Sequence, residues 1–325
     1  MKKVLNSRFW GVLGVMFSVL LTACGGASST VNPLVPARVI AFGDALSTVN
    51  ASGQGTYTVQ TGETDNTVAG RLASRYSIAL NGTLSQPLAS TGGFSYASGS
   101  ARVSDVVTQI NTFLTQVNNV VGSKDLIVIT VGDLDIYDAA PTNNTAAIST
   151  AVQNLVAAIR RLTTAGAQYV VIMQPLNMAR TPWAVTNSLT TNAQGLSYDT
   201  GTACMSFSCQ LTAQLNIQYP ATSGHQPVLL ADLASYFNLI TGTTGTGNAN
   251  TFASYGVANP DVVACTVNTP SCTTSTVTSG TNSWNGVAWD YTTSIFADNL
   301  NLTPFANRLL ADYIYTTSMY RAGWR

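Results

Sequence analysis

The sequence predicts an α/β protein in which helices cover both faces of a parallel β-sheet. Two observations lead to this prediction. Short runs that are apolar at every position, as in strands buried on both faces, recur along the chain. Between them lie longer stretches in which apolar residues return every three or four positions, as on one face of a helix. Strands and helices that alternate in this way are typical of a parallel sheet between two helical layers.

The strands and helices are predicted in order along the chain. The strands are the apolar runs at 39–42, 126–131, 169–173 and 228–231. Three helices have a start signal: Asn66 or Thr67 can cap the first and Ser104 the second, and Thr303 can cap the last, with Pro304 at its first helical position. The remaining helices are placed by apolar spacing alone, at about 145–164, from 210 and at 233–240.

The stretches between these elements are predicted to be loops, because they consist mostly of Gly, Thr, Ser and Asn. Residues 92–103 are predicted to be a Gly/Ser turn, and residues 180–208 a polar connection. The longest such stretch, 241–294, is predicted to be an irregular insertion within one domain that spans 37–325.

The N-terminus has the pattern of a bacterial export signal. A positively charged start is followed by an apolar run at 9–21 and by the tetrad Leu-Thr-Ala-Cys, which ends at Cys24. The tetrad matches the lipobox, in which the cysteine is acylated and becomes the new N-terminus. An ordinary secretory signal and a membrane anchor are the alternatives, but the run is shorter than the roughly 20 residues of a bilayer span. We therefore expect a signal peptide at 1–23, a lipid-anchored tether at 24–36 and, since Gly25 rather than Asp follows the cysteine, sorting to the outer membrane.

The composition excludes an electrostatic nucleic-acid binder. Only 9% of the residues are charged, and removal of the predicted signal leaves 11 basic residues against 14 acidic ones. Such a weakly charged, hydroxyl-rich surface is typical of exported proteins and has no basic footprint for a polyanion. The expected partner is the membrane, through the anchor, and the oligomeric state is left open.

Four cysteines remain once Cys24 is assigned to the lipid anchor. An even number in an exported protein predicts disulfides, and four cysteines allow three connectivities. The spacing favours the two local bridges, Cys204–Cys209 and Cys265–Cys272. A zinc site is a weak alternative, because the chain has one histidine and neither pair is Cys-x-x-Cys.

The first candidate site residues follow the first strand. Residues 39–42 run into Gly43-Asp44-Ala45-Leu46, and the end of a buried strand is where α/β enzymes place nucleophiles. This stretch resembles the first block of the GDSL, or SGNH, ester hydrolases, in which Gly-Asp-Ser-Leu carries the catalytic serine. Ala45 takes that position here, and alanine has no oxygen that could attack an ester.

The resemblance extends from Arg38 to about Tyr315 and implies the fold of that family, a three-layer α/β/α, flavodoxin-like sandwich. The family's second block resembles residues 96–103, and Gly99 matches the glycine whose amide is an oxyanion donor. The family's third block, Gly-x-Asn-Asp, resembles residues 132–135, where Leu134 replaces the asparagine that donates to the oxyanion. Loss of one such donor costs about 2.7–4 kcal/mol of transition-state stabilisation in a serine protease. No cofactor or metal is expected.

The last block carries the family's acid and base. Residues 298–302 resemble Asp-x-x-His-Pro, so Asp298 is kept and Asn301 stands where the histidine base is expected. A neutral amide does not accept a proton near pH 7. The resemblance therefore implies that the nucleophile, the base and one oxyanion donor have all been replaced.

Other polar residues are candidates to substitute for the lost groups. Ser47 is an ordinary turn or capping residue by its position, and His225 precedes a strand, at the edge of the sheet opposite the expected site. The carboxylates Asp44, Asp133 and Asp298 could gather at the rim as an acid–base pair or a cation site. We instead expect Asp44 and Asp135 to bind turn amides and Asp133 to be solvated.

Three functions from different classes follow from these patterns. The leading one is a surface lipoprotein with a degenerate hydrolase site that binds an acyl or glycan ligand. The second is an active ester hydrolase with an unrecognised nucleophile such as Ser47, and the third is a structural or adhesive surface protein.

Overall fold

The computed structural model describes residues 33–84, 88–198, 203–220, 225–242, 251–281 and 286–325. All of them except Pro33 belong to one compact unit, Leu34–Arg325. The predicted signal peptide and the lipidation residue Cys24 lie outside the described residues. Leu34 and Pro36 are buried, so the packed domain includes the end of the segment that was predicted to be a tether. No helix in the described ranges is both long and apolar enough to span a membrane.

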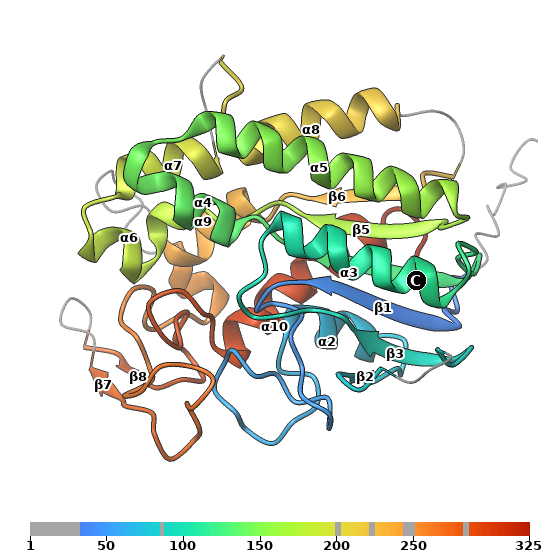
Figure 1. The fold of residues 1–325 in the computed structure, drawn as a ribbon. Coiled ribbons are helices and arrows are strands. Elements are labelled where there is room, and N and C mark those ends of the chain that lie inside the picture. Colours follow the sequence, from blue (N-terminus) through green and yellow to red (C-terminus); the bar gives the residue numbers. More distant parts are fainter. Residues whose placement is uncertain (1–32, 85–87, 199–202, 221–224, 243–250, 282–285) are drawn as a thin grey trace, which may run out of the picture. The chain divides into compact units, whose positions relative to one another are not determined.

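A parallel sheet lies at the centre of this unit, with the strand order β2-β3-β1-β4-β5-β6 (Figure 1). Every neighbouring pair in it is parallel. The four predicted strands are confirmed, and two short strands join them at one edge. The strands are β1 (Arg38–Gly43), β2 (Leu80–Asn81), β3 (Gly92–Ser95), β4 (Asp125–Thr130), β5 (Tyr169–Met173) and β6 (Val228–Ala231).

Strand β3 corrects the sequence analysis, which expected a turn at its position. Its sequence, Gly-Gly-Phe-Ser, has the glycines of a turn, but these glycines serve the packing of the strand. A Cβ atom on Gly93 would lie 2.3 Å from the carbonyl oxygen of Ala79, so only glycine fits this close approach.

Two helical layers cover the sheet (Figure 1). Helices α3, α5 and α8 pack side by side on one face, and α2 and α9 pack against α10 on the other. The predicted three-layer, flavodoxin-like sandwich is therefore confirmed. The helices are α2 (Val68–Ser74), α3 (Val103–Gln116), α4 (Asp133–Ala139), α5 (Thr145–Thr164), α6 (Pro182–Thr186), α7 (Thr190–Ser197), α8 (Phe207–Gln218), α9 (Leu233–Thr241) and α10 (Pro304–Ile314), with the single turns η1 (Ala140–Thr142), η2 (Met178–Arg180), η3 (Phe252–Tyr255) and η4 (Tyr315–Met319).

The helix starts agree with the sequence at two of three predicted caps. Thr67 accepts a hydrogen bond from the Gly70 N–H, and Thr303 caps α10 with Pro304 in its first turn. Helix α3, in contrast, begins before Ser104. The Arg102 N–H donates to the Asp105 carboxylate over 2.9 Å, which places the cap at Arg102, two residues earlier than predicted.

The insertion is partly ordered by its own small core. Cys265 and Cys272 are bonded to each other and pack with Val59 and Ala297. The hairpin of β7 (Gly280–Thr281) and β8 (Ala288–Trp289) follows. The second predicted bridge, Cys204–Cys209, is also present and ties a loop to the first turn of α8.

The strand order decides where a site can form. Strand β1 lies between β3 and β4. Strands β2 and β3 lie on one side of β1, and the later strands β4, β5 and β6 lie on the other, so the order of the strands reverses at β1. Ligands of such sheets bind outside the carboxyl ends of the strands at this reversal. The turn after β1 and the start of α4, directly after β4, both lie at this point.

Candidate functional site at the carboxyl edge of the sheet

The turn after β1 is held tightly against β4. Gly43 has a φ of +136°, and a Cβ atom there would lie 1.9 Å from the Thr130 carbonyl oxygen, so no other residue fits. The Asp44 N–H donates to that carbonyl over 3.1 Å. From α3, the Gln109 side chain accepts from the Gly43 N–H over 2.7 Å and donates to the Gly43 carbonyl over 3.1 Å. Ala45 is therefore presented, half-buried, on a rigid turn.

Ser47 lies beneath the rim of the site, by which we mean the surface at the carboxyl edge of the sheet around Ala45. Its side chain is fully buried, and its hydroxyl lies 2.8 Å from the hydroxyl of Thr130. Its carbonyl accepts a hydrogen bond from Ser95. These contacts give Ser47 a structural role beneath the turn.

The loop of residues 96–102 brings Gly99 to the same rim. The Ser98 N–H donates to the Gly43 carbonyl over 3.0 Å, which places the loop beside Ala45. The ring of Tyr57 packs directly on Gly99, because a Cβ atom there would lie 2.0 Å from Tyr57 Cε2. Within the described part of the chain, neither the Ala45 nor the Gly99 N–H has a hydrogen-bond acceptor. Two backbone donors are thus available to a ligand oxygen.

Helix α4 places three neighbouring residues at the rim. Leu134 is half-buried, and the carboxylates on either side of it bind backbone amides. Asp133 accepts from the Leu176 N–H over 2.9 Å, and Asp135 accepts from the Val103 N–H over 3.1 Å. The expectation that Asp133 is solvated was wrong, because the chain leaving β5 passes close enough to donate this hydrogen bond.

Burial changes the protonation of these carboxyls. It raises the pKa of Asp133 to about 6 and that of Asp135 to about 6, although each accepts a backbone hydrogen bond. Burial also raises the pKa of Asp44 well above its ordinary value, and the charge of Asp133 raises it further. The charge of Asp135 likewise adds to the raised pKa of Asp133. No group of three His, Cys, Asp or Glu side chains in the described ranges is placed to hold a metal ion.

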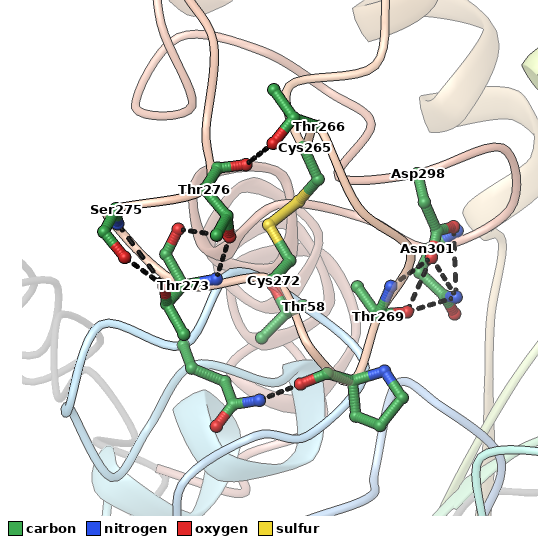
Figure 2. Close-up of a disulfide and its surroundings, with 12 residues drawn as sticks. Thr58, Cys265, Thr266, Thr269, Cys272, Thr273, Ser275, Thr276, Asp298 and Asn301 are labelled. Atoms are coloured by element: carbon green, nitrogen blue, oxygen red, sulfur yellow. Dashed lines mark hydrogen bonds between the residues drawn. A yellow bond between two sulfur atoms is a disulfide. The ribbon is translucent and has the colours of Figure 1, made fainter.

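Asp298 and Asn301 form a hydrogen-bond network with Thr269, which lies in the loop between Cys265 and Cys272, called the disulfide loop below (Figure 2). The Asn301 side-chain amide donates to both carboxylate oxygens of Asp298, over 3.1 and 3.0 Å, and to the Thr269 hydroxyl over 2.9 Å. Thr269 donates to Asp298 through its hydroxyl over 2.6 Å and its N–H over 3.1 Å. The Leu300 and Asn301 N–H groups donate to the same carboxylate over 3.0 and 2.8 Å.

This network keeps Asp298 ionised. Burial raises the pKa of Asp298, but the hydrogen bonds from Thr269, Leu300 and Asn301 outweigh burial and hold the pKa below its ordinary value. The carboxylate has no contact with Asp44 or Asp133 among its hydrogen bonds or charge interactions. Asp298 is thus held by its own hydrogen bonds, whereas the charge of Asp133 acts on Asp44 and that of Asp135 acts on Asp133. That Asp298 gathers with these carboxylates stays a prediction.

The disulfide loop also holds the segment that carries Tyr57. The Gln60 N–H donates to the Cys272 carbonyl over 2.9 Å, and its side-chain amide donates to the Pro270 carbonyl. The Thr58 hydroxyl donates to the Leu302 carbonyl over 2.7 Å. Tyr57 is thus fixed between Gly99 and the residues that follow Asn301.

Two grooves of the described surface lie away from this rim. One, of about 670 Å³, lies between α3, α5 and α8, and another, of about 500 Å³, borders α2. Neither is lined by Ala45, Gly99, Leu134 or Asn301. His225 lies at the opposite edge of the sheet, as expected, where its Nε2 is 2.6 Å from the Gln168 carbonyl oxygen.

Three contributors to the rim were missed in the sequence analysis. Gln109 and Tyr57 carry no local signal, because each acts on a residue distant in sequence. Thr269 has a weak signal, since it lies between the two cysteines of a predicted loop. None of the three belongs to the blocks on which the resemblance rests.

The chain is similar to solved structures and matches a family model. An acetyl xylan esterase is similar at 13% identity and a TM-score of 0.45, over 86% of this chain and 98% of the other. A protein from Bacillus subtilis is similar at 13% identity and a TM-score of 0.43, over 90% of this chain and 58% of the other. No curated protein matches the sequence. The family model of the GDSL-like lipase/acylhydrolases matches residues 39–314, and the chain belongs to that family.

Proposed function

We propose that this family member does not hydrolyse esters and that its rim at the carboxyl edge of the sheet binds an acyl group. One observation carries the proposal: the side-chain amide of Asn301, at the position of the family's base, is hydrogen-bonded to Asp298 and Thr269. An amide nitrogen that donates these hydrogen bonds has no lone pair for a proton. The residue at this position therefore cannot activate a nucleophile.

The residues at and near the position of the family's nucleophile support the same proposal. Ala45 occupies the apex of the turn and offers a methyl group where the family has a hydroxyl. The alternative nucleophile, Ser47, is fully buried and bonded to Thr130, which argues against an active hydrolase that uses it. Leu134 adds no hydrogen-bond donor to the rim.

An acyl oxygen is the ligand group that the rim fits best. The N–H groups of Ala45 and Gly99 lack acceptors within the described residues, and both border the same turn. Two converging amides bind a carbonyl or carboxylate oxygen in acyl-transfer enzymes, and here no reaction follows. The half-buried Tyr57 ring beside Gly99 would flank the acyl chain. A glycan is the alternative ligand.

We further propose that the protein is a lipoprotein anchored through Cys24 in the bacterial outer membrane. The support is the sequence pattern around Cys24 and the entry of the chain into the domain at Leu34, at the edge opposite the rim.

Activity on a short aryl ester tests the proposed loss of chemistry. The unaltered protein should hydrolyse 4-nitrophenyl butyrate no faster than a heat-denatured sample, and a serine-reactive phosphonate should not label it. The variant with Ala45→Ser, Leu134→Asn and Asn301→His restores the three groups, which act as a unit, so each single change should recover little. Because Thr269 holds residue 301, adding Thr269→Ala to this variant should raise the rate further.

The control is Ala322→Ser, which adds a hydroxyl at an exposed site near the C-terminus and should gain neither turnover nor labelling. Turnover of the ester by the unaltered protein, or its labelling by the phosphonate, would overturn the proposal. Ligand binding is scored separately by thermal shift with decanoate and with xylose oligomers. Stabilisation by decanoate that Tyr57→Ala abolishes supports the acyl ligand, whereas stabilisation by the sugars alone contradicts it.

A further inference from the structure

The described charges are unevenly divided between the two edges of the sheet. Carboxylates gather at the carboxyl edge, where strands end and helices begin. They include Asp44, Asp105, Asp133, Asp135, Asp138, Asp232 and Asp298. At the amino edge, the helix ends and loops carry basic residues instead. They are Arg75, Lys124, Arg160, Arg161, Arg321 and Arg325, all exposed.

Few of these basic residues are neutralised by the protein. Arg38, at the start of β1, pairs with Asp125, and Arg75 pairs with Asp312. Lys124 and the two arginines at the end of α5 have no carboxylate within ion-pair distance in the same ranges. The amino edge is therefore positively charged even though the chain as a whole is nearly neutral.

Hydrogen bonds and ring contacts show that these residues share one face. Ala37 donates to the Lys124 carbonyl over 3.0 Å, and Val121 donates to the Ala165 carbonyl over 2.8 Å. Tyr219 joins the ends of α5 and α8 through Thr163, 2.9 Å away. The C-terminal segment closes the face, because Trp324 packs on His225 and Tyr169.

Exposed apolar side chains stand among the charges. Ile217, near the end of α8, is 82% exposed, Val120 is 70% exposed, and Val35 is 69% exposed. Tyr320 is 49% exposed, and the Arg325 guanidinium lies 4.8 Å from its ring centroid. Next to Ile217 opens the groove of about 670 Å³, lined by Leu114 and Val156 together with Arg160 and Arg161. Aliphatic tips beside unpaired cations suit the boundary between lipid headgroups and acyl chains.

We propose that this face, defined by Val35, Val120, Lys124, Arg160, Arg161 and Ile217, docks on an anionic phospholipid bilayer. The occupant is argued from charge complementarity and from the place where the domain begins, since residues 34–37 lead into β1 beside Lys124 on this face. An anchor at Cys24 would hold this face at the membrane and turn the rim with Ala45 away from it. The inference rests on the proposed anchoring.

Two positions on the full chain test the orientation. Ile217→Cys adds a single reactive thiol to the docking face, and Val262→Cys adds one to an aliphatic position that is 48% exposed in the insertion. Each is labelled with nitrobenzoxadiazole without reduction and mixed with vesicles of phosphatidylcholine, alone or with one third phosphatidylglycerol. The label at 217 should shift to the blue and be quenched by a spin-labelled lipid with the anionic vesicles. The label at 262 should not change. Equal responses, or no response at 217, overturn the proposal.

Paired charge variants test the role of the arginines. Arg160→Gln with Arg161→Gln should lower the partition onto anionic vesicles by about 10- to 30-fold, from the usual attraction of two basic residues near such a surface. Arg71→Gln with Arg308→Gln removes the same charge elsewhere and should lower it less than threefold. Equal losses in both pairs, or tighter binding to soluble heparin than to vesicles, contradict a bilayer-docking face. Release of Cys24→Ser into the soluble fraction scores the anchoring alone, so the two proposals fail separately.

Discussion

The two ends of the candidate site, at Ala45 and at Asn301, differ in the hydrogen bonds that surround the residue. At Ala45 the turn is rigid, but the methyl group takes part in no hydrogen bond and the neighbouring amides lack acceptors within the described chain. At Asn301 the side-chain amide nitrogen donates hydrogen bonds to Asp298 and Thr269. The side chain at the first end is thus free of hydrogen bonds, whereas the side chain at the second end is held by several. A change at the first end should therefore be easy to reverse, and a change at the second should not.

The largest expected effect is at the rebuilt end. Asp298→Ala removes the acceptor of three backbone N–H groups and of two side chains, so we expect a loss of about 3 kcal/mol in the free energy of unfolding. Urea unfolding measures it. Asp290→Ala is the matched control, because the Asp290 side chain also closes a turn but, within the described residues, accepts hydrogen bonds only from Thr292. A loss no greater than that of the control would show that the network is not structural.

The next effect concerns the carboxylates near Ala45. The pKa of Asp133 is raised to about 6 in the folded protein, so the folded state binds a proton more tightly than the unfolded chain does. The protonated Asp133 therefore contributes its full stabilisation below about pH 4, and this contribution, about 3 kcal/mol, is lost as the pH rises through 6. Asp298, whose pKa is lowered, works in the opposite direction at lower pH.

Asp133→Asn isolates this contribution. Its melting temperature should exceed that of the unaltered protein at pH 8, and the difference should shrink towards pH 4.5. Asp138→Asn, at an exposed residue paired with Arg102, should show no such trend. A difference that stays constant with pH would mean that Asp133 is ionised throughout.

The smallest expected effects are the stability changes of single substitutions at Ala45 and at Asn301, the two ends of the site. Ala45→Ser should change the free energy of unfolding by less than about 0.5 kcal/mol, since a half-buried turn position has room for a hydroxyl. Asn301→His should cost about 1–2 kcal/mol, because one imidazole N–H cannot replace the hydrogen bonds of the amide. Thermal and urea unfolding of both variants measure the difference. An Ala45→Ser variant that is less stable than the Asn301→His variant would reverse the comparison.

Local patterns in the sequence predicted the frame of the molecule. Apolar spacing placed α5 at 145–164, as found, and the caps at Thr67 and Thr303 are correct. Strand β3 was missed because its glycines allow both a turn and a close approach to β2. The contacts of Tyr57 with Gly99 and of Thr269 with Asp298 join residues far apart in sequence, which no periodicity encodes. The blocks of the family identify which positions line the rim, and only the fold shows what surrounds them.

The hydrogen bonds that join the start of the domain to its end bear on how the chain folds. Thr58 bonds Leu302, Asn307 bonds Asn66, and Gln60 bonds Pro270, across 244, 241 and 210 residues of sequence. Contacts between such distant residues form late and slow the folding of a chain. If the chain is exported from its N-terminus as we propose, it could not complete these contacts until its last helix, α10, had crossed the membrane. The domain would then stay incompletely folded during export, and the rim would form only after the whole chain had crossed.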